Sequence, residues 1–182
     1  MDGEICLQQA YDAILQGDFE LALDWFQQAI ALEPDNASYY YKGSVTFARS
    51  GKLQLAKSYA QKATELAPDE PVYQLQLQIV TARLIVAEIR IKLATVSPDL
   101  VQCMNNLQEA TRLDPLSVEA KLLLAIAYRM EGSYGQSLAM LSETLQLDPL
   151  NEEAIRLRQQ IRVERRRVLK QQFSQQTTKR NR

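Results

Sequence analysis

The chain repeats itself at a regular spacing, and this feature limits its fold more than any other. Four prolines end similar phrases, and successive prolines lie 34, 47 and 34 residues apart. The phrases are Leu32-Glu33-Pro34, Leu66-Ala67-Pro68, Leu113-Asp114-Pro115 and Leu147-Asp148-Pro149. Small side chains keep the same spacing at Ala22, Ala56, Cys103 and Ser137. Because independent sets of positions share one spacing, we expect a stack of similar units that supply one another's core.

Each unit is expected to form two α-helices, so the pattern predicts an all-α fold. In the first unit, apolar side chains recur at steps of three and four residues, which places them on one face of a helix. They are Phe19, Ala22, Phe26 and Ala29. Gly17 precedes this helix and suits the end of an earlier helix, where a positive φ is needed. The prolines beside the next helix starts remove an N–H that would lack a partner anyway.

The positions just described, from Gly17 to Pro34, closely resemble the second half of a tetratricopeptide repeat. The segments from Gly51 to Pro68 and from Gly132 to Pro149 repeat the pattern. The resemblance implies a right-handed α-solenoid of four helix-turn-helix repeats, in which the first helix of each repeat lines a concave groove. The array is expected over residues 1–150, with repeats at 3–36, 37–70, 71–117 and 118–151. The implied function is a protein-binding scaffold, adaptor or assembly factor that holds a peptide or a partner helix in the groove.

The third repeat carries a 13-residue insertion, and nothing between Pro71 and Pro98 breaks a helix. The simplest prediction is one helix over residues 71–96, and the alternative is a kink near Thr81. Thirteen residues rotate a helix by about 1300°, so its two ends cannot present the same face. The apolar side chains of the second half then pack either on the following helices or on a second copy of the chain. The latter alternative predicts a self-assembly interface at Ile85, Ile89 and Leu93.

The implied groove has a lining of tyrosine, aliphatic and polar or cationic side chains. It is formed by Tyr11, Tyr41, Lys42, Val45, Arg49, Gln76, Ile79, Arg83, Leu122, Ile126 and Arg129, with Leu7 beside them. Tyrosine and arginine are frequent in binding hot spots, and arginine can hold a carboxylate through two parallel hydrogen bonds. We therefore expect a protein or peptide partner with apolar anchors and some acidic residues. In the tyrosine run 39–41, Tyr40 is expected in the core and Tyr41 toward the groove.

One known activity of the family is disfavoured by the residues themselves. Some tetratricopeptide domains hold the acidic C-terminus of large chaperones with a clamp of lysine, asparagine and arginine side chains. The corresponding positions here are Leu7, Tyr11, Lys42, Val72 and Gln76. None of them carries the residue that the clamp requires.

The C-terminal region differs from the repeats in charge. Residues 151–182 hold ten basic and three acidic side chains, whereas residues 1–150 hold 11 basic and 19 acidic ones. We expect a capping helix over 151–172 and a disordered, basic and polar tail over 173–182. The basic side chains near the end of the cap are Arg162, Arg165, Arg166, Arg167 and Lys170. A basic helix on an acidic body is either simply solvating or, as the alternative to a peptide-binding scaffold, associates with RNA or an anionic membrane.

Composition argues against an enzyme. The chain has no histidine, the commonest general base and metal ligand, and only two cysteines. Paired carboxylates lie at turns beside helix starts, where the helix dipole favours them. We expect no catalytic residues, metal, cofactor or small-molecule substrate. The N-terminus lacks a secretory signal, and charges interrupt the most apolar stretch, so we expect a cytoplasmic protein with reduced cysteines.

Overall fold

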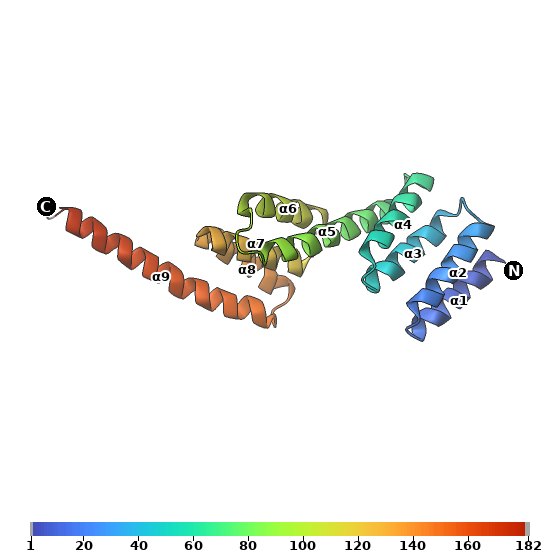
Figure 1. The fold of residues 1–182 in the computed structure, drawn as a ribbon, viewed down its shortest axis with the longest axis horizontal. Coiled ribbons are helices and arrows are strands. Elements are labelled where there is room, and N and C mark those ends of the chain that lie inside the picture. Colours follow the sequence, from blue (N-terminus) through green and yellow to red (C-terminus); the bar gives the residue numbers. More distant parts are fainter. Residues whose placement is uncertain (1, 181–182) are drawn as a thin grey trace. The chain divides into compact units, whose positions relative to one another are not determined.

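A computed structural model describes residues 2–180, with side chains through residue 171, and every regular element among them is a helix (Figure 1). The helices are α1 (Gly3–Leu15), α2 (Phe19–Leu32), α3 (Ala37–Arg49), α4 (Leu53–Leu66), α5 (Pro71–Leu93), α6 (Leu100–Leu113), α7 (Val118–Glu131), α8 (Tyr134–Leu147) and α9 (Glu152–Arg180). Helices α1 and α2, α3 and α4, and α7 and α8 pack as hairpins. The predicted all-α class is confirmed, and these three hairpins correspond to the first, second and fourth of the predicted repeats.

Local side-chain chemistry determines where these helices begin and end. Asp18 before α2 and Asp99 before α6 each accept a hydrogen bond, at 3.0 Å, from a backbone N–H three residues later. Each cap satisfies a donor that has no partner inside the helix. The turns inside the hairpins contain glycines with positive φ, for example 79° at Gly17 and 87° at Gly132. A side chain would be strained in this conformation, so the predicted glycine turns are confirmed.

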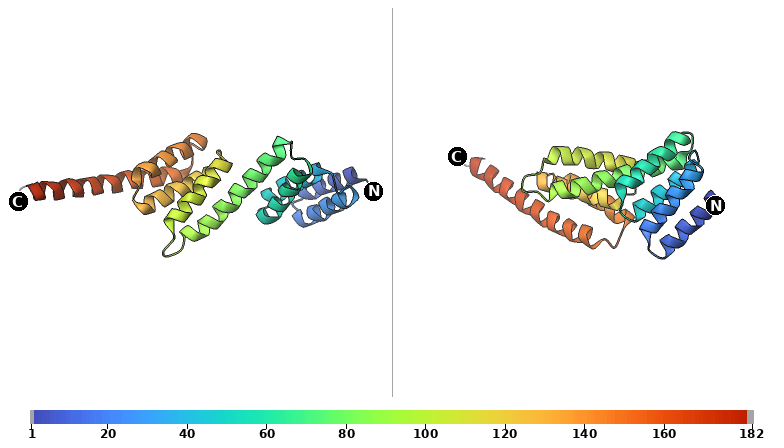
Figure 2. Two further views of the ribbon diagram at one scale, coloured as in Figure 1. Left: turned by 90° about the horizontal axis from the view of Figure 1, so that it is seen from above. Right: turned by 45° about the vertical axis from the view of Figure 1, so that its right-hand side comes forward.

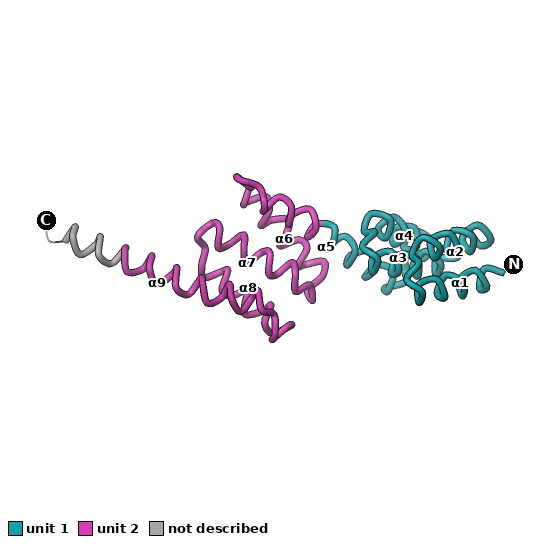
Figure 3. Tube along the Cα trace, turned by 60° about the horizontal axis from the view of Figure 1, so that its bottom comes forward, with its two compact units in different colours: residues 1–84 teal, residues 85–182 magenta. Residues whose placement is uncertain are grey.

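The helices form two units, residues 1–84 and 85–182 (Figure 3). In the first unit, Phe26 of α2 and Phe47 of α3 are fully buried, and their rings meet edge to face with centroids 6.1 Å apart. Cys6 of α1 and Val80 of α5 belong to the same buried cluster. The first half of α5 therefore completes the core that α1–α4 begin.

The core of the second unit joins α9 to the last hairpin. Its buried cluster consists of Leu122, Ala125, Leu141, Ala154, Leu157 and Ile161. The three residues from α9 lie at steps of three and four residues, so one face of that helix is buried. Helix α9 thus covers apolar surface of α7 and α8, which is the capping role expected of the C-terminal helix.

The long insertion is accommodated in one helix, because α5 runs without a break from Pro71 to Leu93 (Figure 2). It ends three residues before the predicted boundary at residue 96. Val80 belongs to the core of the first unit, and Ile89, nine residues later, is also fully buried. Nine residues turn a helix by about 900°, so these two side chains leave α5 on opposite sides. As the insertion predicted, the two ends of α5 bury different faces.

The prediction for the tyrosine run of α3 is wrong in one respect, because Tyr39 rather than Tyr40 is the deeply buried ring. Only 2% of Tyr39 is exposed, and its hydroxyl donates a hydrogen bond to Oε1 of Glu33 at 3.1 Å. Gly3 makes room for this pair, since a Cβ there would lie 2.5 Å from that oxygen. Tyr40 is only half-buried, against Tyr59. The space beside Gly3, and not the position of each tyrosine in the repeat, therefore decides which ring is buried.

Helix α9 continues to Arg180, past the predicted end of the cap at residue 172. Neither glycine nor proline interrupts it, and its many arginine and glutamine residues favour helix. The disordered tail was predicted for residues 173–182. The side chains of these residues, and residues 181–182 altogether, lie outside the part of the chain that the structure describes. Among the described residues, no helix is both long enough and apolar enough to cross a membrane.

Candidate functional site

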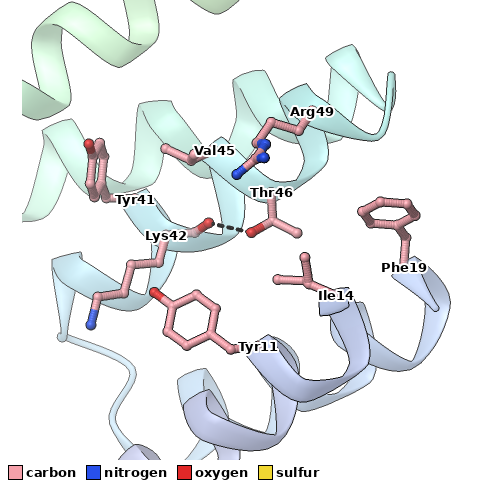
Figure 4. A pocket seen from close by; sticks show the side chains of 8 residues that line it. All are labelled: Tyr11, Ile14, Phe19, Tyr41, Lys42, Val45, Thr46 and Arg49. Carbon is pink, nitrogen blue, oxygen red and sulfur yellow. Dashed lines mark hydrogen bonds between the residues drawn. The ribbon is translucent and has the colours of Figure 1, made fainter. Parts of the chain in front are cut away.

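A pocket of about 460 Å³ opens between α1 and α3 in the first unit (Figure 4). Its lining consists of Tyr11, Ile14, Phe19, Tyr41, Lys42, Val45, Thr46 and Arg49. The volume falls within the range of roughly 300–1,000 Å³ that is common for ligand pockets.

The apolar wall of the pocket is built by side chains that converge from three helices. Tyr11 and Ile14, three residues apart on α1, point toward α3, where Val45 lies (Figure 4). Phe19 closes one end from the start of α2. The ring of Tyr11 rests edge to face on the fully buried ring of Phe26, with centroids 6.4 Å apart. Because the core of the unit supports this wall, the pocket is preformed.

Two cationic side chains lie along the α3 wall of the pocket. Lys42 and Arg49 are seven residues apart, which is two helical turns or about 10 Å along the axis. Neither the ammonium nor the guanidinium forms an ion pair or a hydrogen bond with any side chain in the described part of the protein. Unpaired cations beside an apolar wall favour a ligand that combines apolar and carboxylate groups.

The tyrosines add neutral polar groups to the pocket. Burial raises the pKa of Tyr11, and the nearby Glu4 and Tyr41 raise this pKa further, so the phenol stays protonated at neutral pH. A neutral phenol can both donate and accept a hydrogen bond. Tyr41 packs against Tyr73 of α5, with ring centroids 5.0 Å apart, which holds Tyr41 beside the pocket.

The pocket brings together several residues that the sequence predicted for the groove. They are Tyr11, Tyr41, Lys42, Val45 and Arg49. Sequence reasoning missed Ile14, Phe19 and Thr46. The three-residue step from Tyr11 was a signal for Ile14, whereas Phe19 had none, because it lies on a second helix and only first helices were expected to line the groove.

Other residues predicted for the groove of the first unit lie elsewhere. Leu7 is only 2% exposed and belongs to the core, so its predicted place in the groove is wrong. It shares its side of α1 with the buried Ala10 three residues later. Gln76 of α5 donates a hydrogen bond to Oγ of the buried Ser44 at 3.1 Å, which ties α5 to α3. Ile79 is half-buried and Arg83 is exposed, outside the pocket lining.

In the second unit, α9 covers the predicted groove residues of α7. Leu122 is 8% exposed within the core cluster, so its prediction as an open groove residue is wrong. Arg129 donates two hydrogen bonds to Glu164 of α9, at 3.1 and 2.6 Å, which lower the pKa of Glu164 and raise that of Arg129. Ile126 and Arg129 line a smaller pocket of about 300 Å³ together with residues of α9. The predicted groove residues of α7 are covered because α9 packs against the face of α7 that carries them.

The predicted second interface on α5 is partly core. Ile89 is fully buried, whereas Ile85 and Leu93 are half-buried. Ile89 is therefore not an exposed interface residue, because the rotation of the long helix points this side chain toward other residues of the same chain.

The basic side chains predicted on α9 all lie at the surface. Arg162, Arg165, Arg166, Arg167 and Lys170 are exposed.

No cluster in the described residues resembles a metal centre, since none brings together three or more histidine, cysteine, aspartate or glutamate side chains in a suitable arrangement. Cys6 and Cys103 are both free and buried, as predicted for packing residues. Burial raises the pKa of the Cys103 thiol, which disfavours a reactive thiolate at neutral pH.

Three models of one repeat family match the chain. A model described as TPR repeat matches residues 14–51, and two described as tetratricopeptide repeat match residues 37–70 and 105–152. Between residues 14 and 152 they leave out only residues 71–104, where the insertion lies. None of the curated proteins is similar enough to count as a relative.

Several solved structures have a similar fold. A MamA double mutant (MamA RS-1 ArsTM) is 15% identical with a TM-score of 0.55, over 90% of this chain and 84% of that one. MamA from Desulfovibrio magneticus RS-1 is 16% identical with a TM-score of 0.52, over 95% and 96%. The Cut9–Hcn1 hetero-tetramer of APC/C is 17% identical with a TM-score of 0.53, over 88% of this chain and 30% of that one. Identities this low establish the fold alone.

Proposed function

Because the chain belongs to the tetratricopeptide-repeat family, we propose that it is a scaffold or adaptor whose first unit binds a segment of a partner protein between α1 and α3. The family and the fold are typical of protein-interaction modules that carry no enzymatic activity. A chain of the APC/C hetero-tetramer Cut9-Hcn1 shares the fold and is named as part of that assembly.

The observation that carries this proposal is the combination of a preformed apolar wall with two unpaired cations. The wall of Tyr11, Ile14 and Val45 suits an aromatic or aliphatic anchor residue. Lys42 and Arg49 suit carboxylates on either side of that anchor. In an extended peptide three residues span about 10 Å, the axial separation of the two cations. The proposed ligand is therefore a peptide with two acidic residues about three positions apart and an apolar residue between them.

The test is a selection from a randomised 12-residue peptide library on phage, with the full chain as bait. Enriched peptides are expected to share the acidic and apolar pattern, and their affinity is measured by fluorescence anisotropy. Arg49→Glu and Lys42→Glu should each weaken binding about tenfold or more, since a hydrogen bond to a charged group contributes about 1.5–3 kcal/mol.

Lys62→Glu is the matched control because it makes the same charge change on α4, where the exposed Lys62 forms an ion pair with Glu65. It should change the affinity less than twofold. Enrichment of peptides without acidic residues would contradict the proposed ligand. Equal weakening by Lys62→Glu would show that general charge, and not the pocket, holds the peptide.

A further inference from the structure

The outer half of α9 is the most concentrated positive surface among the described residues. Among the described side chains of this helix, Ile161 is the last buried one, and every one after it is at least partly exposed. Arg162, Arg165 and Arg166 are exposed, and within the described part of the protein none of them has an ion pair or a hydrogen bond.

The one acidic residue in this stretch does not offset the positive charge of the surface. After Glu153, Glu164 is the only acidic residue of the sequence. Its carboxylate accepts two hydrogen bonds from Arg129 of α7, and its pKa is lowered as a result. Glu164 therefore faces the body of the second unit. Arg167 is near enough to lower the pKa of Glu164 further, whereas Arg162, Arg165 and Arg166 have no carboxylate partner among the described residues.

The arrangement of the cations around α9 indicates what kind of anion they fit. At about 100° per residue, Arg165, Arg162, Arg166 and Arg167 cover an arc of about 200°. A flat surface can contact only one side of a helix, whereas a groove contacts both sides. The major groove of B-form DNA is about 12 Å wide and admits an α-helix, while the major groove of A-form RNA is too deep and narrow for side chains to enter.

A membrane surface fits this helix less well than a groove does. Interfacial helices need a continuous apolar face opposite a basic one. The exposed apolar residues here are Val163 and Leu169, 48% and 43% exposed. They are six residues apart, so they point about 120° away from each other, and both lie within the arc of arginines, so they form no apolar face opposite it.

We propose that the surface of α9 formed by Arg162, Arg165, Arg166, Arg167 and Lys170 binds double-stranded DNA. It would contact the phosphates on both walls of the major groove without reading the base sequence. Guanidinium groups hold phosphates through two parallel hydrogen bonds, and four of the five cations are arginines. The function proposed for the pocket and this one use different units, so the protein would bring a bound partner protein to DNA.

The experiment measures binding of the full chain to a fluorescein-labelled 20-base-pair DNA duplex by anisotropy, in a series of salt concentrations. A triple variant, Arg162→Gln, Arg165→Gln and Arg166→Gln, is compared with a control that removes the same charge from the first unit, Lys52→Gln, Lys57→Gln and Lys62→Gln. The arginine variant should bind about tenfold or more weakly, and the slope of log K against log salt should become shallower by about 3. The control should stay within about twofold of the unchanged protein.

Parallel samples contain an RNA duplex of the same length and vesicles with 30% phosphatidylserine. Circular dichroism of both variants should show an unchanged helix content, because the substituted side chains are at least partly exposed. The proposal is overturned if the unchanged protein does not bind duplex DNA at about 50 mM salt, or if the lysine control loses as much affinity as the arginine variant. RNA bound as tightly as DNA would refute the groove argument, and arginine-dependent binding to vesicles alone would assign the surface to a membrane.

Discussion

A close approach between two helices makes Gly43 of α3 difficult to replace. A Cβ at this position would lie 2.7 Å from Cδ1 of the Tyr59 ring on α4. Tyr59 in turn packs edge to face on the buried Phe47, with ring centroids 5.2 Å apart, so its ring has little room to move. The glycine is thus required by packing, although alanine would be the better helix former.

Gly43→Ala should therefore lower the free energy of unfolding by about 1–3 kcal/mol, the usual cost of overpacking a core. Gly135→Ala is the control: it lies in α8, and a Cβ there would meet no atom within 4 Å. That change should leave stability the same or raise it by up to about 1 kcal/mol. Urea unfolding followed by circular dichroism measures both, and a Gly43→Ala protein as stable as the Gly135→Ala protein would contradict the packing argument.

Tyr39 should make stability depend on pH in the alkaline range. Burial, together with the hydrogen bond to Glu33, raises the pKa of Tyr39 to about 12, whereas an unfolded tyrosine has its pKa near 10. The stabilisation is therefore fully present below about pH 10 and is lost as pH rises from there toward 12. Urea unfolding at several pH values above 9 should show a steeper fall for the unchanged protein than for Tyr39→Phe. Parallel curves for the two proteins would rule out this role of Tyr39.

At the scale of elements, α5 illustrates how an insertion changes which residues are buried. The helix is continuous, and its two ends bury different faces because the extra residues rotate the helix relative to the repeat pattern. Ile89 and Ile91 are two residues apart, yet Ile89 is fully buried and Ile91 is 73% exposed. Substitutions at these two positions therefore distinguish internal packing of α5 from self-assembly through α5.

Ile89→Glu should destabilise the protein strongly, since it places a carboxylate without a partner in the core. Ile91→Glu should melt close to the unchanged protein, because its side chain is solvated. Thermal melts and light scattering are measured on both variants. If Ile89→Glu were well folded but dissociated from a larger assembly, Ile89 would be an interface residue instead of a core residue.

At the scale of the whole molecule, the chain consists of two units, and each unit buries one cysteine. Cys6 is buried in the first unit, and Cys103 is buried in the second. Because a buried thiol reacts only after local opening, the two cysteines report separately on the two units.

Phe47→Ala should lower the stability of the first unit by about 3–5 kcal/mol, since its ring is fully buried there. We expect faster alkylation of Cys6 under native conditions and a smaller change at Cys103. Mass spectrometry of the labelled peptides measures both rates. An equal acceleration at the two cysteines would mean that the protein unfolds as a single cooperative unit.

The periodic patterns of the sequence were enough to predict the helices, the glycine turns and five residues of the pocket, from Tyr11 to Arg49. These features are local, because helix faces, caps and turns depend on residues within a few positions of one another. Burial is not local. Tyr39 is buried because Gly3 of another helix leaves space for it, Leu122 and Arg129 are covered because α9 packs on α7, and Ile89 is buried because an insertion rotates α5. In each case burial depends on which part of the chain packs against the residue, and only the tertiary structure shows that packing.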